Sequence, residues 1–359
     1  MQYDLVVVGA GPAGCRTAQI VAKAGYKVLV VEEHGEVGVP TQCTALVSEK
    51  IGEIPKEIIV NEINTAKFCS DGNSFEIKSK DPMYLLDRCG FDKFIYRQAV
   101  DSGAEFKLNT HFLSYEKIGD TADALRVKTS NGNFETKILV GADGPNSNVA
   151  RVADLRLPKK LLYLMQVRAK VKCDPETVEM WFGSDIAPGN FAWVVPENES
   201  YVRIGMMSNA SPKELFEKFF DKRTGYSLRD VVKISNRIGD VIRYGLIEKS
   251  ATSRILLVGD AAAQIKPFSA GGLVYGQICA KFAGKACIKA LQKNNFSEKF
   301  LTEEYDKKWK NELSGGIKKG LFFKKVFKSI QDRPFAFSLI KKTRLAVLAS
   351  FFDIDFIGK

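Results

Sequence analysis

The sequence is poor in residues that bind metals. It has two histidines, His34 and His111, and seven cysteines, none of which forms a C-x-x-C pair. The cysteines are Cys15, Cys43, Cys69, Cys89, Cys173, Cys279 and Cys287. Zinc and iron–sulfur sites need such residues at short, regular spacing, so the pattern predicts no metal centre. Scattered cysteines are typical of proteins from a reducing compartment.

The sequence also lacks a secretory leader and long apolar runs. The first predicted strand begins at about residue 3, with no charged leader and apolar core before it. No apolar run approaches the roughly 18 residues of a membrane-spanning helix. We therefore expect a cytoplasmic protein, either free or peripheral on the inner face of a membrane. At 359 residues, of which 45% are hydrophobic, the chain is long enough for two globular cores.

Positive charge is concentrated near the end of the chain. Residues 307–344 contain twelve basic and two acidic residues, so this segment carries a net charge of +10. The net charge of the whole chain is +11. The rest is nearly neutral, which argues against binding to nucleic acid. Apolar residues at helical spacing are Phe323, Val326, Phe327 and Ile330, and the lysines expected on the other side are Lys324, Lys325 and Lys328. A basic amphipathic helix suits an anionic membrane surface; the alternative is a helix packed on the body with a solvated lysine face.

The most informative stretch is Val6–Ala18, where an apolar strand breaks into a glycine pattern and continues into small residues that open a helix. Gly9 allows a tight turn, Gly11 lets the backbone approach a pyrophosphate, and Gly14 allows close packing of helix on strand. The amide groups at the helix start, including those of Ala13 and Gly14, attract the pyrophosphate. The pattern therefore predicts a dinucleotide cradle.

A second predicted strand, 27–31, supports this interpretation. It delivers Glu32, whose carboxylate is placed to accept both ribose hydroxyls of a dinucleotide. The alternative is a structural βαβ unit that binds no ligand.

Two later segments repeat the order strand, turn, helix. The first is 139–151, with the turn Asp143-Gly144, and the second is 254–280, with the turn Gly259-Asp260. Each turn stands at the end of a predicted strand, where open α/β sheets bind ligands.

These motifs, in this order, resemble the FAD-dependent para-hydroxybenzoate-hydroxylase-like superfamily up to about residue 295. The resemblance implies FAD and an α/β fold with a discontinuous Rossmann-like FAD-binding domain, an antiparallel-sheet substrate domain and a C-terminal helical region. The predicted boundaries are 1–55, 85–160 and 250–295 for the FAD-binding domain, 56–84 and 161–249 for the substrate domain, and 296–359 for the basic helical region.

The same resemblance implies several cofactor contacts. Arg88, in a predicted helix, is expected near the FAD phosphates, and Asp260 on the ribityl hydroxyls. The turn at Asp143 is expected to brace the crevice. Phe112, in the strand after the helix of Arg88, is expected to offer its backbone to the adenine.

The segment after Asp260 adds a glycine-rich helix start. Its candidate cofactor residues are Pro267, Gly271, Gly272 and Leu273. Amides at the positive end of a helix suit the negative charge that a reduced flavin carries. The alternative is a glycine-rich turn without a ligand.

Within the superfamily, the loop 37–48 is similar to the cysteine loop of the geranylgeranyl reductase family, whose flavoenzymes saturate isolated double bonds of isoprenoid chains. Cys43 stands in the cysteine position, next to Thr44, and the loop is expected to pass over the flavin. The family usually reads Cys-x-Gly, whereas this chain has Ala45 in place of the glycine. Cys43 is expected to shape the site or relay a proton, a positioned water is the rival proton source, and a buried inert cysteine is the alternative.

The segment Pro188–Pro196 is similar to the family's Tyr/Phe-x-Trp-x-Phe-Pro motif through Phe191 and Trp193. Residues at alternate strand positions share a face, so the two rings are expected to form one apolar wall and to stabilise positive charge on a reacting alkene. The alternative is an ordinary core pair.

The resemblance implies an FAD-dependent reductase whose substrate is an isoprenoid lipid. Its external electron donor is expected to be NAD(P)H or ferredoxin. Three alternatives stay open: a flavin-dependent monooxygenase or halogenase, a non-catalytic isoprenoid-binding escort protein, and an electron-transfer quinone reductase.

Overall fold

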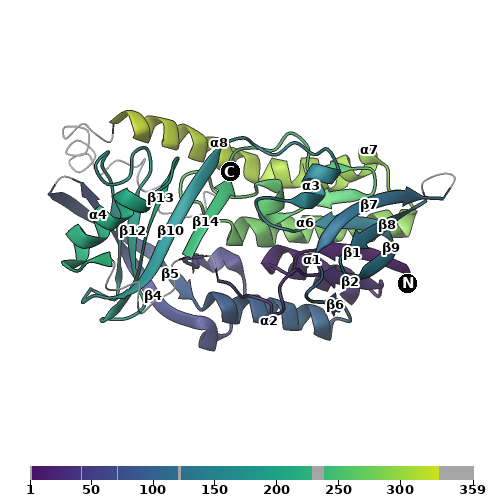
Figure 1. Cartoon of the computed structure of the whole chain (residues 1–359), viewed down its shortest axis with the longest axis horizontal. Coiled ribbons are helices and arrows are strands. Elements are labelled where there is room, and N and C mark those ends of the chain that lie inside the picture. Colours follow the sequence, from purple (N-terminus) through teal and green to yellow (C-terminus); the bar gives the residue numbers. More distant parts are fainter. Residues whose placement is uncertain (1, 42, 71, 120–122, 229–237, 331–359) are drawn as a thin grey trace.

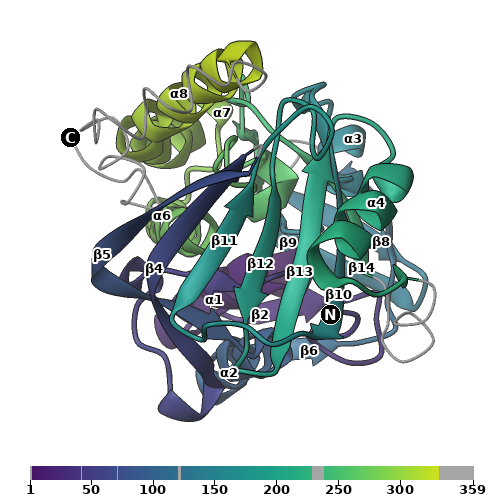
Figure 2. The ribbon, with the colours of Figure 1, turned by 90° about the vertical axis from the view of Figure 1, so that its left-hand side faces the viewer.

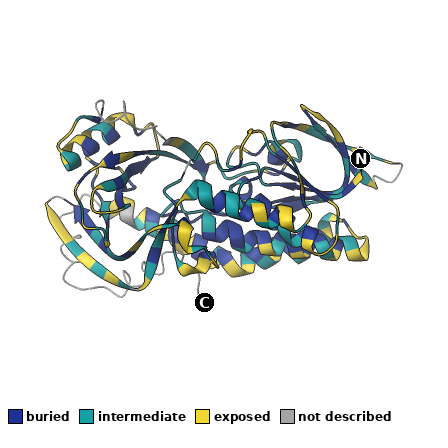
Figure 3. Ribbon diagram, turned by 90° about the horizontal axis from the view of Figure 1, so that it is seen from below, coloured by how far each residue is buried: buried dark blue, intermediate teal, exposed yellow. Residues whose placement is uncertain are grey.

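The computed structural model describes residues 2–41, 43–70, 72–119, 123–228 and 238–330 (Figure 1). Two sheets stand at opposite ends of the molecule, and the long helix α8 (Lys307–Ile330) runs along one side of both. Buried residues run through the middle, and exposed residues gather on the outer faces of the helices (Figure 3).

Sheet A is the Rossmann-like sheet predicted from the glycine motif. Its main strand order is β15-β16-β9-β1-β2-β6, and neighbours from β16 to β6 are parallel. The strands are β1 (Gln2–Val8), β2 (Val28–Val31), β6 (Glu105–Lys107), β7 (Phe112–Ile118), β8 (Ala124–Thr129), β9 (Gly132–Gly141), β15 (Ala251–Thr252) and β16 (Ile255–Leu257). β2 is buried along its whole length, as the apolar run 28–31 requires of a central parallel strand.

Helices cover sheet A. They are α1 (Pro12–Lys23), α2 (Arg88–Asp101), α3 (Asn148–Val152) and α6 (Leu273–Lys293). A 3₁₀ turn spans Gly259–Ala262, and α7 (Glu298–Leu301) with a π-helical turn, Thr302–Asp306, leads into α8. The predicted helix of Arg88 begins at that residue, because Leu86 still belongs to a strand.

Sheet B has the order β14-β10-β13-β12-β11-β4-β5-β3. Its strands are β3 (Leu46–Val47), β4 (Ile59–Ser70), β5 (Asn73–Leu86), β10 (Leu161–Lys170), β11 (Thr177–Trp181), β12 (Ala192–Pro196), β13 (Tyr201–Ser208) and β14 (Ile238–Arg243). Helix α4 (Lys213–Thr224) packs on one face, where Phe216 and Phe220 are buried (Figure 2). 3₁₀ turns at Glu49–Ile51 and Lys56–Ile58 lead into β4.

The predicted antiparallel substrate sheet contains one parallel pair. β4 and β11 run parallel, with Ala66 opposite Val178. More than a hundred residues separate the two strands, so no hairpin dictates their direction, and sheet B is mixed. The two sheets alternate along the chain in the predicted order, and the domain boundaries stay a prediction.

The C-terminal helix α8 is docked on the body. Trp309, Leu313 and Ile317 are buried, and Leu321 contacts both the sheet A and the sheet B cores. This supports the packed-helix alternative for the described part of the basic segment. The side chains of Phe327 and Ile330, and residues 331–344, lie outside the described residues. No helix in the described part of the chain is long and apolar enough to cross a bilayer.

Lys324 corrects the expected lysine face of α8. Its side chain is buried, donates a hydrogen bond to Asn190 Oδ1 and lies 5.0 Å from the centroid of the Tyr244 ring. Lys325 and Lys328 are exposed, as expected. The amphipathic pattern placed Lys324 outward because helical spacing says nothing about a polar partner such as Asn190 on the opposing surface.

Burial lowers the pKa of Lys324 from 10.5 to about 8, which predicts a pH-dependent stability. Between pH 8 and 10.5 the unfolded chain keeps a proton that the folded chain has lost, so the free energy of unfolding should rise with pH. The shift corresponds to about 3 kcal/mol. We expect Lys324→Met to remove this rise and to unfold at higher urea concentration than the wild type at pH 7.

Urea unfolding at pH 7 and pH 10 checks this expectation. Lys325→Met, which removes the neighbouring exposed lysine, is the control and should keep the wild-type pH dependence. Identical pH dependences in the wild type and Lys324→Met would contradict it.

Candidate functional site

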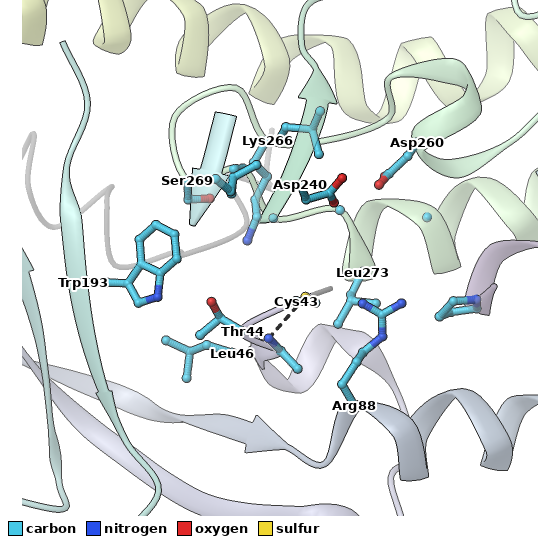
Figure 4. A pocket seen from close by; sticks show the side chains of 18 of the residues that line it. Cys43, Thr44, Leu46, Arg88, Trp193, Asp240, Asp260, Lys266, Ser269 and Leu273 are labelled. Carbon is cyan, nitrogen blue, oxygen red and sulfur yellow. Dashed lines mark hydrogen bonds between the residues drawn. The ribbon is translucent and has the colours of Figure 1, made fainter. Parts of the chain in front are cut away.

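A cavity of about 410 Å³ lies where the strand ends of sheet A face sheet B. Eleven of the predicted site residues line it: Gly11, Ala13, Cys43, Thr44, Arg88, Phe191, Trp193, Asp260, Gly271, Gly272 and Leu273. Its polar end is built from the glycine turns and its other end from one face of sheet B (Figure 4). The structure thus brings the cofactor motifs and the aromatic motif to one space.

The first glycine turn has the geometry of a dinucleotide cradle. A Cβ on Gly14 would lie 2.1 Å from the Gly9 carbonyl oxygen, and one on Gly9 would lie 2.3 Å from that of Ala142. Gly9 also has a φ of 101°, which favours glycine. At Gly11 a Cβ would meet no atom within 4 Å, and Gly11 lines the cavity. Gly9 and Gly14 therefore hold the turn together, while Gly11 faces open space.

Glu32 is held at the end of β2, beside this turn. Its Oε2 accepts the Ala10 backbone N–H at 2.7 Å, and its Oε1 accepts the His34 N–H at 3.0 Å. His34 Nδ1 lies 2.7 Å from the same Oε1. The carboxylate is thus fixed next to the glycine turn, outside the lining of the cavity.

Arg88, the first residue of α2, is anchored by a carboxylate one turn along. Its Nε lies 2.7 Å from Asp92 Oδ1 and its Nη2 lies 3.1 Å from Oδ2. Burial alone would lower the pKa of Arg88, but the charge of Asp92 and hydrogen bonds with Asp92 and Cys43 hold that pKa above its usual value. Arg88 is therefore a fixed cation at the cavity, as an anion-binding site needs.

Two carboxylates lie across the cavity from Arg88 (Figure 4). Burial, and then the charge of Asp240, raise the pKa of Asp260 to about 6, against the opposing effect of Arg88. Burial likewise raises the pKa of Asp240. Asp240, on β14, was missed by the sequence analysis because a single acid in a strand carries no motif.

The loop before α6 closes the polar end. The Lys266 N–H donates to the Gly271 carbonyl at 3.0 Å, and the Ala270 N–H donates to the Lys266 carbonyl at 2.9 Å. Ser269 Oγ is the one buried side-chain oxygen or nitrogen of the described residues without a hydrogen-bond partner, and Ser269 lines the cavity. An orphaned hydroxyl at a cavity fits a site for a polar ligand.

The cysteine loop lies beside this polar end. Cys43 Sγ accepts the Ala45 N–H at 3.2 Å, and Arg203 from β13 donates to the Thr44 carbonyl at 2.7 Å. Ala45 has a φ of 58°, in the left-handed region that favours glycine. The loop therefore keeps a backbone conformation suited to Cys-x-Gly, although Ala45 stands in the glycine position. The left-handed conformation of this alanine costs about 1–2 kcal/mol of folding free energy.

Sheet B supplies the apolar wall. Besides Phe191 and Trp193, the side chains that line it at alternating strand positions are Ala66, Phe68, Met83, Leu164, Val178, Met180, Val195 and Ile242. The rings of Phe191 and Trp193 meet edge to face, with centroids 6.3 Å apart, and Phe268 lies 5.6 Å from Phe191. A Cβ on Gly205 would lie 2.4 Å from Trp193 Cζ2, so Gly205 makes room for the indole.

Gln166 joins the cysteine loop to this wall. Its buried Oε1 accepts the Trp193 Nε1–H at 3.1 Å and the Thr44 hydroxyl. One buried oxygen thus fixes both motifs relative to each other. The sequence offered no signal for Gln166, because its two partners are distant in the chain.

Four further predicted residues do not line the cavity. Gly9 and Gly14 hold the first turn, and Pro267 lies in the loop before α6. Phe112 begins β7, and its carbonyl accepts from Asn148 Nδ2 at 3.1 Å. Its contact with adenine stays a prediction.

Asp143 is also outside the cavity lining. Its carboxylate accepts the Ser147 hydroxyl at 2.6 Å and the Val149 N–H at 2.9 Å, which caps the start of α3. The adjoining Gly144 and Pro145 line the cavity. Asp143 therefore braces the turn from behind.

Two families match the chain. The family described as FAD binding domain matches residues 72–276, and the NAD(P)-binding Rossmann-like domain family matches residues 7–45. The first match covers more than half of the chain, and the second covers the first glycine turn and Glu32.

Similar curated proteins are archaeal reductases. The digeranylgeranylglycerophospholipid reductase of Methanocaldococcus jannaschii is 30% identical over 92% of this chain and 88% of its own length. Digeranylgeranylglycerophospholipid reductase 1 of Methanopyrus kandleri is 32% identical over 87% of each chain.

Solved structures share the fold. A geranylgeranyl bacteriochlorophyll reductase-like protein from Thermoplasma acidophilum matches with a TM-score of 0.80 and 24% identity, over 91% of this chain and 87% of its own. A halogenase solved with phloroglucinol and FAD matches with a TM-score of 0.66 and 18% identity, over 85% of this chain and 73% of its own.

Proposed function

Because the chain belongs to the geranylgeranyl reductase family of FAD-dependent oxidoreductases, we propose that it saturates the isolated double bonds of geranylgeranyl chains on a glycerophospholipid. The observation that carries the proposal is the continuity of the cavity. A fixed cation, two buried acids and the glycine turns form one end, and an aromatic wall on sheet B forms the other. This arrangement fits a polar cofactor beside an apolar chain.

FAD fits the polar end residue by residue. Gly11 and Ala13 would receive the pyrophosphate, Glu32 the adenosine ribose, Arg88 the phosphate region and Asp260 the ribityl hydroxyls. The loop from Pro267 to Leu273 would receive the flavin, with Ser269 Oγ free to hydrogen-bond with it. These assignments are supported by the open space at Gly11 and the orphaned hydroxyl of Ser269.

The reaction adds two electrons and two protons, as a hydride and a proton, to an alkene that no carbonyl polarises. When bound, FAD supplies the hydride. Trp193 and Phe191 exclude water and offer ring faces to the carbon that becomes electron-poor. Cys43, whose sulfur is held by the Ala45 amide, shapes the space or relays the proton, with a positioned water as the rival source.

We propose NAD(P)H or ferredoxin as the external electron donor.

The exposed lysines Lys325 and Lys328 near the end of α8 support contact with an anionic membrane surface, from which a lipid substrate would enter. Each basic residue near an anionic membrane surface contributes about 1 kcal/mol to the binding free energy.

An anaerobic turnover experiment tests the function. The FAD-loaded protein is reduced with dithionite, and a digeranylgeranylglycerophospholipid is added in one sample and geranylgeranyl diphosphate in another. We expect reoxidation of the flavin with the phospholipid, together with a product heavier by two hydrogens per saturated bond. If the flavin is reoxidised only by the diphosphate, the diphosphate and not the phospholipid is the substrate. Flavin that stays reduced until oxygen is admitted would contradict the reductase and favour a monooxygenase.

A further inference from the structure

Lys266 is a buried lysine at the candidate flavin site. Its side chain is 4% exposed and lines the cavity. In Figure 4 it extends into the cavity from the loop before α6. Lysine is rarely buried to this extent, because removing an ammonium from water is costly unless the site or its ligand compensates.

The ammonium lies against the first glycine of the Gly271-Gly272 pair. A Cβ on Gly271 would be 2.5 Å from Lys266 Cε and 2.9 Å from Nζ. The hydrogen bonds of the loop fix this placement, because the Lys266 N–H and the Gly271 carbonyl are paired directly. The missing side chain of Gly271 therefore makes room for the end of Lys266.

This position adds charge of the same sign as the helix terminus. Gly272 caps α6, whose 21 residues begin at Leu273, and exposed amides at a helix N-terminus carry partial positive charge. A lysine at that end disfavours the helix unless negative charge comes near. Asp260 is one source of negative charge, since a Cβ on Gly272 would lie 2.7 Å from its Oδ1. Asp240 is a second source, because it lines the same cavity.

We propose that Lys266 sets the reduction potential of the bound FAD, by favouring the negative charge that reduction places on the pyrimidine ring of the flavin. The inference rests on the proposed placement of FAD at the Gly271-Gly272 turn. A group that binds the reduced cofactor better than the oxidised one makes reduction easier. Lys266 and the amides of the turn act together, and the ammonium contributes a full charge at a site buried from water.

The test compares two-electron midpoint potentials of FAD-loaded variants. Lys266→Met removes the charge, Lys266→Arg keeps it, and Lys281→Met removes an exposed lysine of α6. We expect Lys266→Met to lose at least tenfold in the preference for reduced over oxidised FAD, which lowers the potential by about 30 mV. Affinity for oxidised FAD should change little, Lys266→Arg should restore the potential, and Lys281→Met should match the wild type.

A potential that is unchanged in Lys266→Met, or that falls equally in Lys281→Met, would overturn the inference. If Lys266→Met does not hold FAD, Lys266→Gln serves as the second neutral variant. The wild type gives an independent readout: its potential should fall by about 30 mV per pH unit, the value for one proton per two electrons. A slope of about 59 mV would show that the reduced flavin is neutral and would also overturn it.

These outcomes separate the inference from the proposed function. A protein that binds no FAD contradicts the function itself. A protein that binds FAD and saturates the lipid, but whose potential ignores Lys266, contradicts only the role of this lysine.

Discussion

The Gly11→Ala variant is expected to fold like the wild type and to lose FAD. In the structure a Cβ at this position meets no atom within 4 Å, so the protein itself tolerates alanine. The same methyl group would stand where the backbone must approach the pyrophosphate. We expect the dissociation constant for FAD to rise by at least tenfold, or about 1.4 kcal/mol. Fluorescence titration of the apoprotein with FAD measures it, and urea unfolding of the apoprotein measures stability.

Gly14→Ala and Gly315→Ala make the comparison specific. Alanine at Gly14 would place a methyl group 2.1 Å from the Gly9 carbonyl, so this variant should lose folded protein as well as FAD. At Gly315, in α8, a Cβ also meets nothing within 4 Å, but the residue does not line the cavity. That variant should keep wild-type FAD affinity. Wild-type affinity in Gly11→Ala would show that the turn does not hold the pyrophosphate.

The second large effect is expected at Trp193. Replacement by alanine removes the ring that we propose faces the reacting alkene, and cation–π stabilisation in a dry site is worth about 2 kcal/mol. We therefore expect kcat for lipid saturation to fall about thirty-fold in Trp193→Ala, with FAD binding retained. Trp193→Phe keeps a ring face but loses the hydrogen bond to Gln166, and should fall between the two. Single-turnover reoxidation of reduced FAD by the lipid measures the step directly.

Trp181→Ala is the matched control. Trp181 lies on the same sheet, but packs 5.9 Å from Phe219 in the core under α4 and does not line the cavity. Its loss should reduce stability while leaving kcat close to the wild-type value. A similar fall in both variants would assign the effect of Trp193 to general loosening of sheet B.

The correct predictions from the sequence concern residues that are close together in the chain. The glycine pattern at Gly9 and Gly14 reports a turn in which two backbones nearly touch, and such a contact needs glycine wherever it occurs. Phe191 and Trp193 line the same cavity because they stand two residues apart where the chain enters β12. These conclusions need only backbone geometry at short range, and the structure confirms the placement of these residues.

What the sequence did not predict depends on contacts between distant segments. Gln166 is significant only because Thr44 and Trp193 both reach its oxygen. Lys324 has the spacing of a solvated lysine, yet Asn190 and Tyr244, from other segments, bury it. Asp240 acquires its raised pKa from its enclosure in the cavity, which no strand pattern reports.

The interleaved order of sheet A has a consequence for the biogenesis of the protein. Its adjacent strands β2, β1, β9 and β16 come from residues 28–31, 2–8, 132–141 and 255–257, so the three ligand-facing turns assemble only when most of the chain exists. During translation at roughly 5–20 residues per second, the first turn would wait on the order of tens of seconds for its partners. Cofactor capture therefore belongs to the end of synthesis, and a chain that stalls before β16 leaves the ribosome as an apoprotein with an open sheet edge at β9.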